Sequence, residues 1–158
     1  MELEFLAQKK GRNINLDFEI VIGESIGKIK LGMTRQEVHS IYNDFIEYKE
    51  IPYGYDHEMI YDCNDDFQIF YDQNEKVEFI LCMSPDKIVM NGQHFNEEIM
   101  YQDLLNIAKQ DDDVDEDDEG FTCDSLGFGV CLTEDDDGRA LIESVQIVKK
   151  DFWKNEPK

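Results

Sequence analysis

The sequence predicts an α+β fold in which two helices pack on an antiparallel sheet. Apolar and polar residues alternate over 14–22, two later segments have the spacing of amphipathic helices, and short apolar runs are separated by turn-forming residues. The chain has 158 residues, of which 41% are hydrophobic and 11% aromatic, and this is enough for one hydrophobic core. We therefore expect a single domain over residues 1–158.

The first expected element is a half-buried strand, because every second residue of the segment is apolar: Ile14, Leu16, Phe18, Ile20 and Ile22. Gly23 and Gly27 interrupt this pattern, and residues 26–33 are expected to be short and extended. Thr34 and Glu37 then have the spacing of a capping box. The apolar stripe of the helix that follows consists of Val38, Ile41, Tyr42 and Phe45.

The next segment, residues 46–57, contains Pro52 and Gly54 and is expected to be a loop. Strands are expected at 58–63, 67–71 and 77–83, with a turn at 72–75 closing a hairpin between the last two. A second helix is expected to begin near Asn96, with an apolar stripe of Met100, Leu104, Ile107 and Ala108. Further strands are expected at 120–124, 127–132 and 139–148, with a turn from Glu134 to Gly138.

Two halves of the chain, residues 23–83 and 88–149, resemble each other weakly. Ile29-Lys-Leu-Gly32 precedes the first expected helix as Val89-Met-Asn-Gly92 precedes the second, and antiparallel strands follow each helix. Two explanations remain open: a weak tandem repeat of helix plus hairpin, or chance symmetry within one domain.

The chain is strongly acidic, with a formal net charge of −22, and eight of the nine residues from Asp111 to Glu119 are acidic. A block of this density has to stay solvated, bind cations or face a basic partner, so residues 111–119 are expected to form an acidic loop. A surface of this charge repels nucleic acid and anionic membranes. We therefore expect a basic protein as the partner, and neither nucleic acid nor membrane.

No catalytic or metal-binding motif is complete in the sequence. Ser25 lies in a G-x-S-x-G pattern, but no helix follows it directly as a nucleophile elbow requires. The histidines, His39, His57 and His94, lack metal-ligand spacing, and no acidic segment fits a calcium-binding EF-hand loop. We expect no enzyme activity, no cofactor and no metal ligands, with a small enzyme or a calcium-binding module as the alternative.

Partner-binding residues are expected in the acidic segments and in one aromatic loop. The acidic candidates are Asp111, Asp112, Asp113, Asp115, Glu116, Asp117 and Asp118 in the first segment, and Glu134, Asp135, Asp136 and Asp137 in the second. Tyr53 and Tyr55 are the aromatic candidates, because tyrosines are frequent at protein interfaces. Such tyrosines also serve as ordinary loop caps on a core.

The segment Ile26-Gly-Lys-Ile-Lys-Leu-Gly-Met-Thr-Arg-Gln-Glu-Val38 resembles the approach to the first helix in small cytosolic immunity proteins of low-GC Gram-positive bacteria. It is also similar to the corresponding segment of β-lactamase-inhibitor-like proteins and of outer-membrane-assembly lipoproteins. The resemblance implies helices packed on an antiparallel sheet and a function in binding. The lipoproteins carry a signal peptide and an acylated cysteine, and the segment from Met1 to Asn13 shows neither pattern.

Charge and resemblance together suggest a cytoplasmic protein inhibitor. We expect an immunity protein that neutralises a basic toxin domain, such as a nuclease, by occluding its active site. The alternative is a stand-alone acidic interaction protein with a different role.

Overall fold

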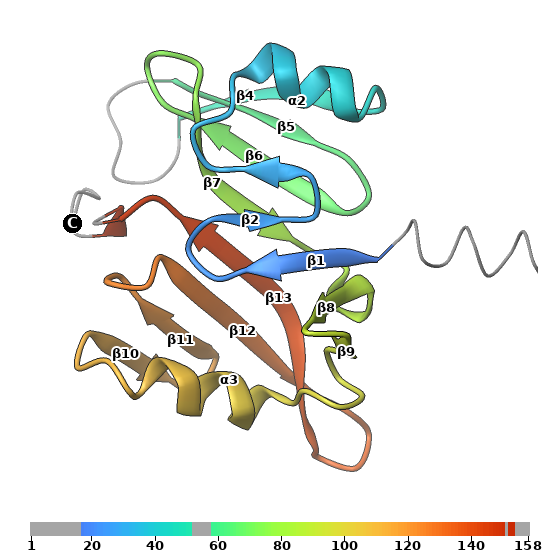
Figure 1. Cartoon of the computed structure of the whole chain (residues 1–158), viewed down its shortest axis with the longest axis vertical. Helices are drawn as coiled ribbons and strands as arrows, with labels where there is room; N and C mark the ends of the chain where they lie inside the picture. Colours follow the sequence, from blue (N-terminus) through green and yellow to red (C-terminus); the bar gives the residue numbers. More distant parts are fainter. Residues whose placement is uncertain (1–16, 52–57, 151, 154–158) are drawn as a thin grey trace, which may run out of the picture.

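The structure is a computed structural model that describes residues 17–51, 58–150 and 152–153, and these residues form two β-sheets (Figure 1). The larger sheet has eight strands, in the spatial order β10 (Val114–Asp117), β11 (Gly120–Cys123), β12 (Phe128–Glu134), β13 (Ala140–Val148), β7 (Val77–Cys82), β6 (Phe67–Tyr71), β5 (Met59–Cys63) and β4 (Ile46–Glu50). The smaller has five, in the order β3 (Ile29–Lys30), β2 (Ser25–Ile26), β1 (Phe18–Val21), β8 (Ile88–Met90) and β9 (Gln93–His94).

The predicted α+β fold, with two helices packed on an antiparallel sheet, is wrong because the described chain is mainly β. Its α-helices are short: α2 (Arg35–Ile41) has seven residues and α3 (Tyr101–Ala108) has eight. A 3₁₀-helix, η1 (Pro85–Lys87), adds one further turn. Thirteen strands make up most of the remaining regular structure in this part of the chain.

Both helices are shorter than predicted for local reasons. The first ends at Ile41 because Tyr42 has extended backbone angles, φ −127 and ψ 128, although Phe45 continues the helical spacing. The second begins at Tyr101, since Asn96 has φ 67 and its side-chain amide bonds the backbone of Ile142.

Two segments predicted as loops contain edge strands of the large sheet. Part of the predicted loop 46–57 is β4, which pairs with β5 over five residues. Part of the predicted acidic loop 111–119 is β10, which pairs with β11 from Val114 to Asp117. Charged side chains on an edge strand discourage pairing with other chains, which accounts for the acidic sequence of β10.

The two halves of the chain have the same order of elements. In the first, α2 precedes the antiparallel strands β4, β5, β6 and β7; in the second, α3 precedes β10, β11, β12 and β13. Each helix is thus followed by a four-stranded meander, one strand more than the three that the sequence predicted in each half. The meanders meet where β7 pairs with β13, with Cys82 opposite Val145 and Phe79 opposite Val148. A common origin of the two halves stays a prediction.

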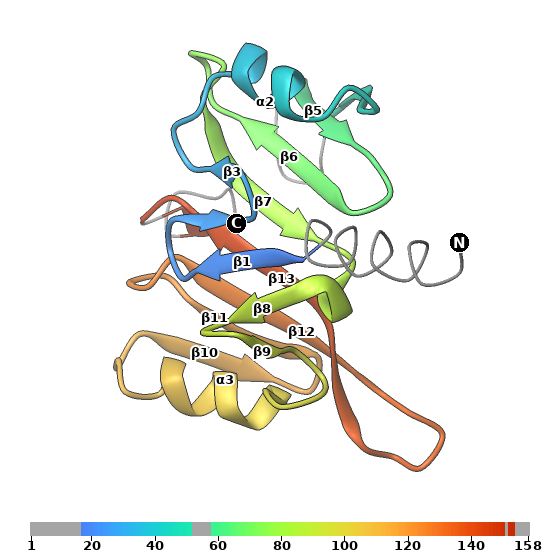
Figure 2. The same ribbon diagram turned by 45° about the vertical axis from the view of Figure 1, so that its right-hand side comes forward.

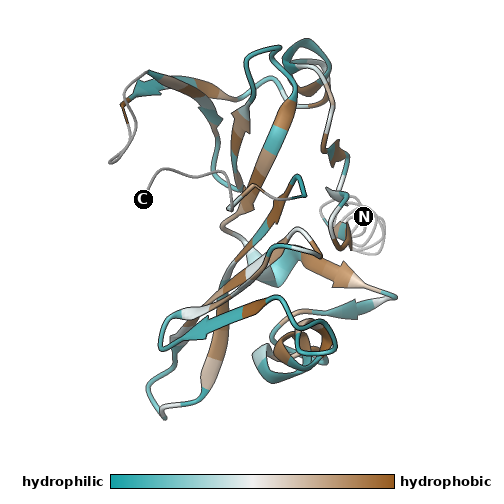
Figure 3. Ribbon diagram, turned by 90° about the vertical axis from the view of Figure 1, so that its left-hand side faces the viewer, coloured by the Kyte–Doolittle hydropathy of each residue, from teal (hydrophilic) through white to brown (hydrophobic). Residues whose placement is uncertain are grey.

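One face of the large sheet is covered by the small sheet and the helices. Phe18 of β1 lies 4.8 Å from Phe67 of β6 between ring centroids, and Tyr101 of α3 lies 5.8 Å from Phe121 of β11. The small sheet crosses the middle of the large sheet (Figures 1 and 2), and both helices lie on the same side as the small sheet (Figure 3). We call this side the covered face. No helix in the described part of the chain is long and apolar enough to cross a membrane.

The predicted capping box of α2 is confirmed. The Thr34 hydroxyl accepts the amide of Glu37 at 3.1 Å, and the Glu37 carboxylate accepts the amide of Thr34 at 3.1 Å. These bonds hold the first turn of α2 against the turn between β6 and β7, where the Arg35 amide donates to the carbonyl of Glu75.

Replacing Thr34 with alanine should lower the free energy of unfolding by about 1 kcal/mol, because the helix loses its N-cap. Urea unfolding followed by circular dichroism measures this change. Gln36→Ala, at an exposed position of the same helix, is the control and should leave stability unchanged or slightly raised. Equal stability of Thr34→Ala and the wild type would show that the cap contributes nothing.

Candidate protein-binding face

The second face of the large sheet carries a row of aromatic side chains. Residues opposite each other on neighbouring strands point to the same side of a sheet. The strand register places Tyr48 of β4 opposite Tyr61, Tyr61 opposite Phe70, and Phe70 opposite Phe79. Val148 of β13 extends this row opposite Phe79. We call this side, which faces away from α3 and the small sheet, the open face.

The aromatic rings of the row contact one another in sequence. Their centroids are separated by 5.4 Å for Tyr48–Tyr61, 4.7 Å for Tyr61–Phe70 and 5.3 Å for Phe70–Phe79. Phe152 continues the row, 5.4 Å from Phe79. Tyr61, Phe70 and Phe79 are only half-buried, in contrast to Phe67 and Ile69 on the covered face. We call the side chains of Tyr48, Tyr61, Phe70 and Phe79, one from each strand from β4 to β7, the aromatic row.

The aromatic row ends at β4, an exposed edge strand whose apolar side chains alternate with charged ones. Ile46, Tyr48 and Ile51 are 62%, 43% and 65% exposed, and all five residues of β4 are exposed. Among the described residues, the other large hydrophobic side chain with comparable exposure is Val21, on β1. Contiguous exposed apolar surface on a folded domain marks an interaction site more often than scattered single residues do.

The other half of the open face is polar and has small side chains. The row next to the aromatic one runs from Leu81 to Gln146, Gly129, Thr122 and Asp115 across five strands. A methyl group at Gly129 would lie 3.2 Å from Trp153, so the indole packs directly on this part of the face. The open face is thus aromatic near β4 and carries carboxylates along β10.

The acidic candidates from the sequence lie at two ends of the large sheet. The β10–β11 turn, which includes Asp118, and the β12–β13 turn, which includes Asp136, lie at the same end because the strands are antiparallel. The connection from α3 to β10, with Asp111 and Asp112, lies at the opposite end (Figure 1). Tyr53 and Tyr55 lie outside the described residues.

Several acidic candidates already serve the local fold. Asp113 accepts the amide of Ser125 at 2.9 Å, and Asp117 accepts that of Glu119 at 2.8 Å. Asp135 accepts two amides within the β12–β13 turn and pairs with Arg139 at 3.3 Å. Glu116 pairs with Lys109 of α3 at 3.3 Å on the covered side. In contrast, the register places Asp115 and Asp117 on the open face.

A buried ionic cluster fastens the β4–β5 hairpin to α2. The Asp62 side chain, only 1% exposed, accepts bonds from Arg35 at 2.9 Å, from the Tyr71 hydroxyl at 2.7 Å and from His39 Nε2 at 2.6 Å. Arg35 also pairs with Glu47 of β4. Burying a charge is unfavourable unless it is paired and hydrogen-bonded. Because Arg35 and His39 of α2 provide these partners, the cluster fixes α2 against β4 and β5.

Burial and hydrogen bonding act in opposite directions on the pKa of Asp62. Burial alone would raise that pKa above its ordinary value of 3.8, but the hydrogen bonds from Arg35, Tyr71 and His39 outweigh it and lower it. Burial and the contact with Asp62 together raise the pKa of Tyr71, so that hydroxyl stays a donor.

Neither the aromatic row nor the Asp62 cluster was predicted from the sequence. Alternation of Ile46, Tyr48 and Glu50 is a strand signal, but Pro52 and Gly54 nearby favoured a loop. The Asp62 cluster joins residues far apart in the chain, and their spacing carries no local signal.

No family model, no curated protein and no solved structure matches the chain. The resemblance to immunity proteins therefore rests on the segment from Ile26 to Val38 alone.

The stability that Asp62 contributes should depend on pH. Because its pKa is lower in the folded state, this contribution is present above about pH 4 and is lost as the pH falls through the folded-state pKa. The difference in unfolding free energy between the wild type and Asp62→Asn should shrink over that range. Asp65→Asn, in the exposed β5–β6 turn, controls for the loss of one charge. A difference that does not change with pH would contradict a charged Asp62.

Proposed function

We propose that the chain is a protein-binding inhibitor whose open face receives a basic protein. The partner that we favour is a toxin domain, such as a nuclease, which the chain neutralises in the cytoplasm of the producing cell. The single observation that carries the proposal is the aromatic row that ends at the exposed edge of β4. On this proposal the chain acts by occluding its partner and has no catalytic activity of its own.

The geometry of the open face supports binding to a protein surface. Interface centres are enriched in tyrosine and phenylalanine, which bury large area with few rotatable bonds. The aromatic row spans four adjacent strands, so its side chains are held in register by backbone pairing. A rigid surface of this kind loses little conformational entropy when a partner docks.

Charge supports a basic partner. The net charge of −22 creates a negative field around the whole molecule, and Asp115 and Asp117 place carboxylates beside the open face. A nuclease presents a positive cleft to bind phosphates, and an acidic surface complements it and accelerates encounter. The exposed side chains of Ile46 and Tyr48 on β4 would then provide contacts that slow dissociation.

The first test is whether the gene directly upstream encodes a secreted toxin; its C-terminal domain is then the partner to assay, and the absence of such a gene would contradict the toxin assignment. Calorimetry should detect a one-to-one complex in which the toxin domain loses its activity. Tyr48→Ala should weaken binding by about 2 kcal/mol, or about 30-fold in Kd, as expected for an interface anchor. Val21→Ala is the matched control, because Val21 is 44% exposed on the small sheet and Tyr48 is 43% exposed.

Two outcomes would contradict the proposal. If the toxin domain did not bind this protein and kept its activity in its presence, the inhibitor role would be wrong. If Tyr48→Ala and Val21→Ala bound as tightly as the wild type, the complex would form through another surface.

Association should be steered by the carboxylates beside the open face. Asp115→Asn with Asp117→Asn should slow association and flatten its salt dependence, since exposed charges act within a Debye length of about 8 Å at physiological salt. Asp111→Asn with Asp112→Asn removes the same charge at the opposite end of the sheet and should have a smaller effect. Stopped-flow association at two salt concentrations compares the pairs. Equal effects of the two pairs would show that only net charge matters.

A further inference from the structure

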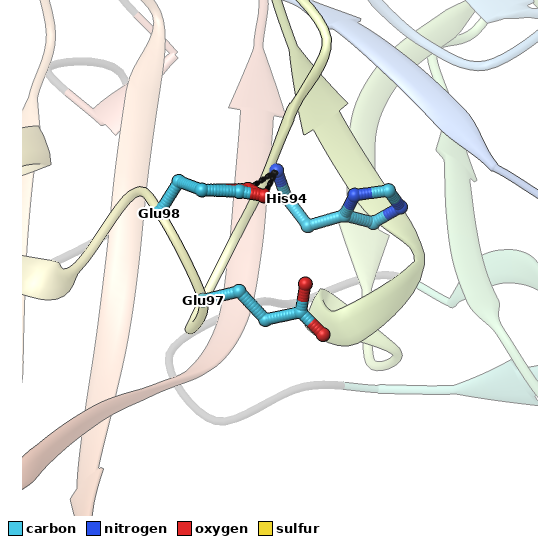
Figure 4. A group of neighbouring side chains, drawn as sticks. All are labelled: His94, Glu97 and Glu98. Atoms are coloured by element: carbon cyan, nitrogen blue, oxygen red, sulfur yellow. Dashed lines mark hydrogen bonds between the residues drawn. The ribbon is translucent and has the colours of Figure 1, made fainter.

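Three potential metal ligands converge in the connection between β9 and α3. One donor atom from each of His94, Glu97 and Glu98 lies within 4.8 Å of the others. In Figure 4 the side chains of Glu97 and Glu98 both point toward His94 from the turn that follows it. This group lies apart from the aromatic row, because β9 belongs to the small sheet.

The turn that carries these side chains is held by several backbone bonds. The amides of Glu98 and Ile99 both donate to the carbonyl of His94, each at 3.1 Å. Asn96, at the centre of the turn, accepts the amide of Ile142 at 2.8 Å and donates to its carbonyl at 2.9 Å. The backbone positions of the three side chains are therefore fixed relative to one another and to β13.

A carboxylate outside the turn holds the imidazole of His94. Asp17, which immediately precedes β1, has its Oδ2 atom 3.3 Å from Nε2 of His94. Because this contact takes up the Nε2 side of the ring, Nδ1 is the ring nitrogen left for a metal ion. Histidines that bind metals almost always direct their other ring nitrogen at a carboxylate or carbonyl. Asp17 is thus placed where such a supporting carboxylate lies.

The charges around His94 are uncompensated in the described part of the chain. Asp17, Glu97 and Glu98 bring three carboxylates to one imidazole, and none of them pairs with a lysine or arginine there. Glu98 accepts the backbone amide of His94 at 3.2 Å. The side chains of Glu97 and Glu98 are exposed, so no packing opposes the short movement that coordination needs. A divalent cation would offset this concentration of negative charge.

We propose that His94, Glu97 and Glu98 bind one transition-metal ion of the zinc class, with Asp17 as the positioning residue of His94. One imidazole and two carboxylates form a mixed nitrogen and oxygen donor set, which suits zinc with bonds of about 2.0–2.2 Å. Calcium prefers six to eight oxygen ligands, which this group does not provide. Three protein ligands leave the fourth position of a tetrahedral zinc ion to water. The site is independent of the proposed inhibitor function.

Zinc titration of the full chain tests the site. Calorimetry in excess calcium, which saturates weak acidic sites, should show one zinc ion per chain. His94→Gln should lower zinc affinity at least about tenfold, and Asp17→Asn should lower it about 10- to 100-fold, as losses of supporting carboxylates do. Cobalt added in place of zinc should give a visible absorption band that His94→Gln removes.

Two double variants, each of which removes two negative charges, distinguish a specific zinc site from the general attraction of zinc to an acidic protein. Glu97→Gln with Glu98→Gln should abolish the zinc site, whereas Asp136→Asn with Asp137→Asn, in the exposed β12–β13 turn, should leave it intact. Circular dichroism without metal should show that all variants are folded, and a variant that fails this check is replaced by His94→Ala. Zinc binding by His94→Gln with wild-type affinity, or no zinc binding by the wild type in calcium, would overturn the proposal.

Discussion

The pairing of β7 with β13 is the constraint on which the rest of the structure depends. It joins two four-stranded meanders, each preceded by a short helix, into one eight-stranded sheet. Glu78 and Lys149 reinforce the junction, with a backbone bond of 3.0 Å and an ion pair of 2.8 Å. Because the register continues across it, side chains from both halves align on the same face. Without this junction each half would have one more exposed strand edge, β13 in one half and β7 in the other, and the open face would be divided in two.

The two faces of this sheet differ in burial and in composition. The covered face buries Phe67, Val130 and Val145 under α3 and the small sheet, which provides the core of the domain. The open face keeps half-buried aromatic side chains in register on one half and carboxylates on the other. Most acidic side chains in the described part of the chain are exposed, so solvent screens their repulsion. Asp62, Glu78 and Asp124 are buried exceptions, and Asp62 and Glu78 are paired with basic side chains.

Local signals in the sequence predicted some elements well and failed for others. The capping box of Thr34 and Glu37, and strands β5, β6, β7, β11, β12 and β13, follow from short-range spacing and turn residues. The edge strands β4 and β10 were missed, because Pro52 and Gly54 favoured a loop near the first and the run of acidic residues favoured a loop at the second. The predicted proportion of helix to strand was wrong for the same reason. The aromatic row and the contact between Asp17 and His94 depend on long-range pairing, which no local pattern encodes.

We propose that the open face is the surface that binds a partner. Hydroxyl-radical footprinting of the chain, free and in complex with a toxin domain that it inhibits, tests this directly because oxidation reports side-chain exposure. Tyr48, Tyr61 and Ile46 should become protected in the complex while Val21 stays reactive. Protection confined to Val21 and the covered side, with Tyr48 and Ile46 still reactive, would contradict the proposal.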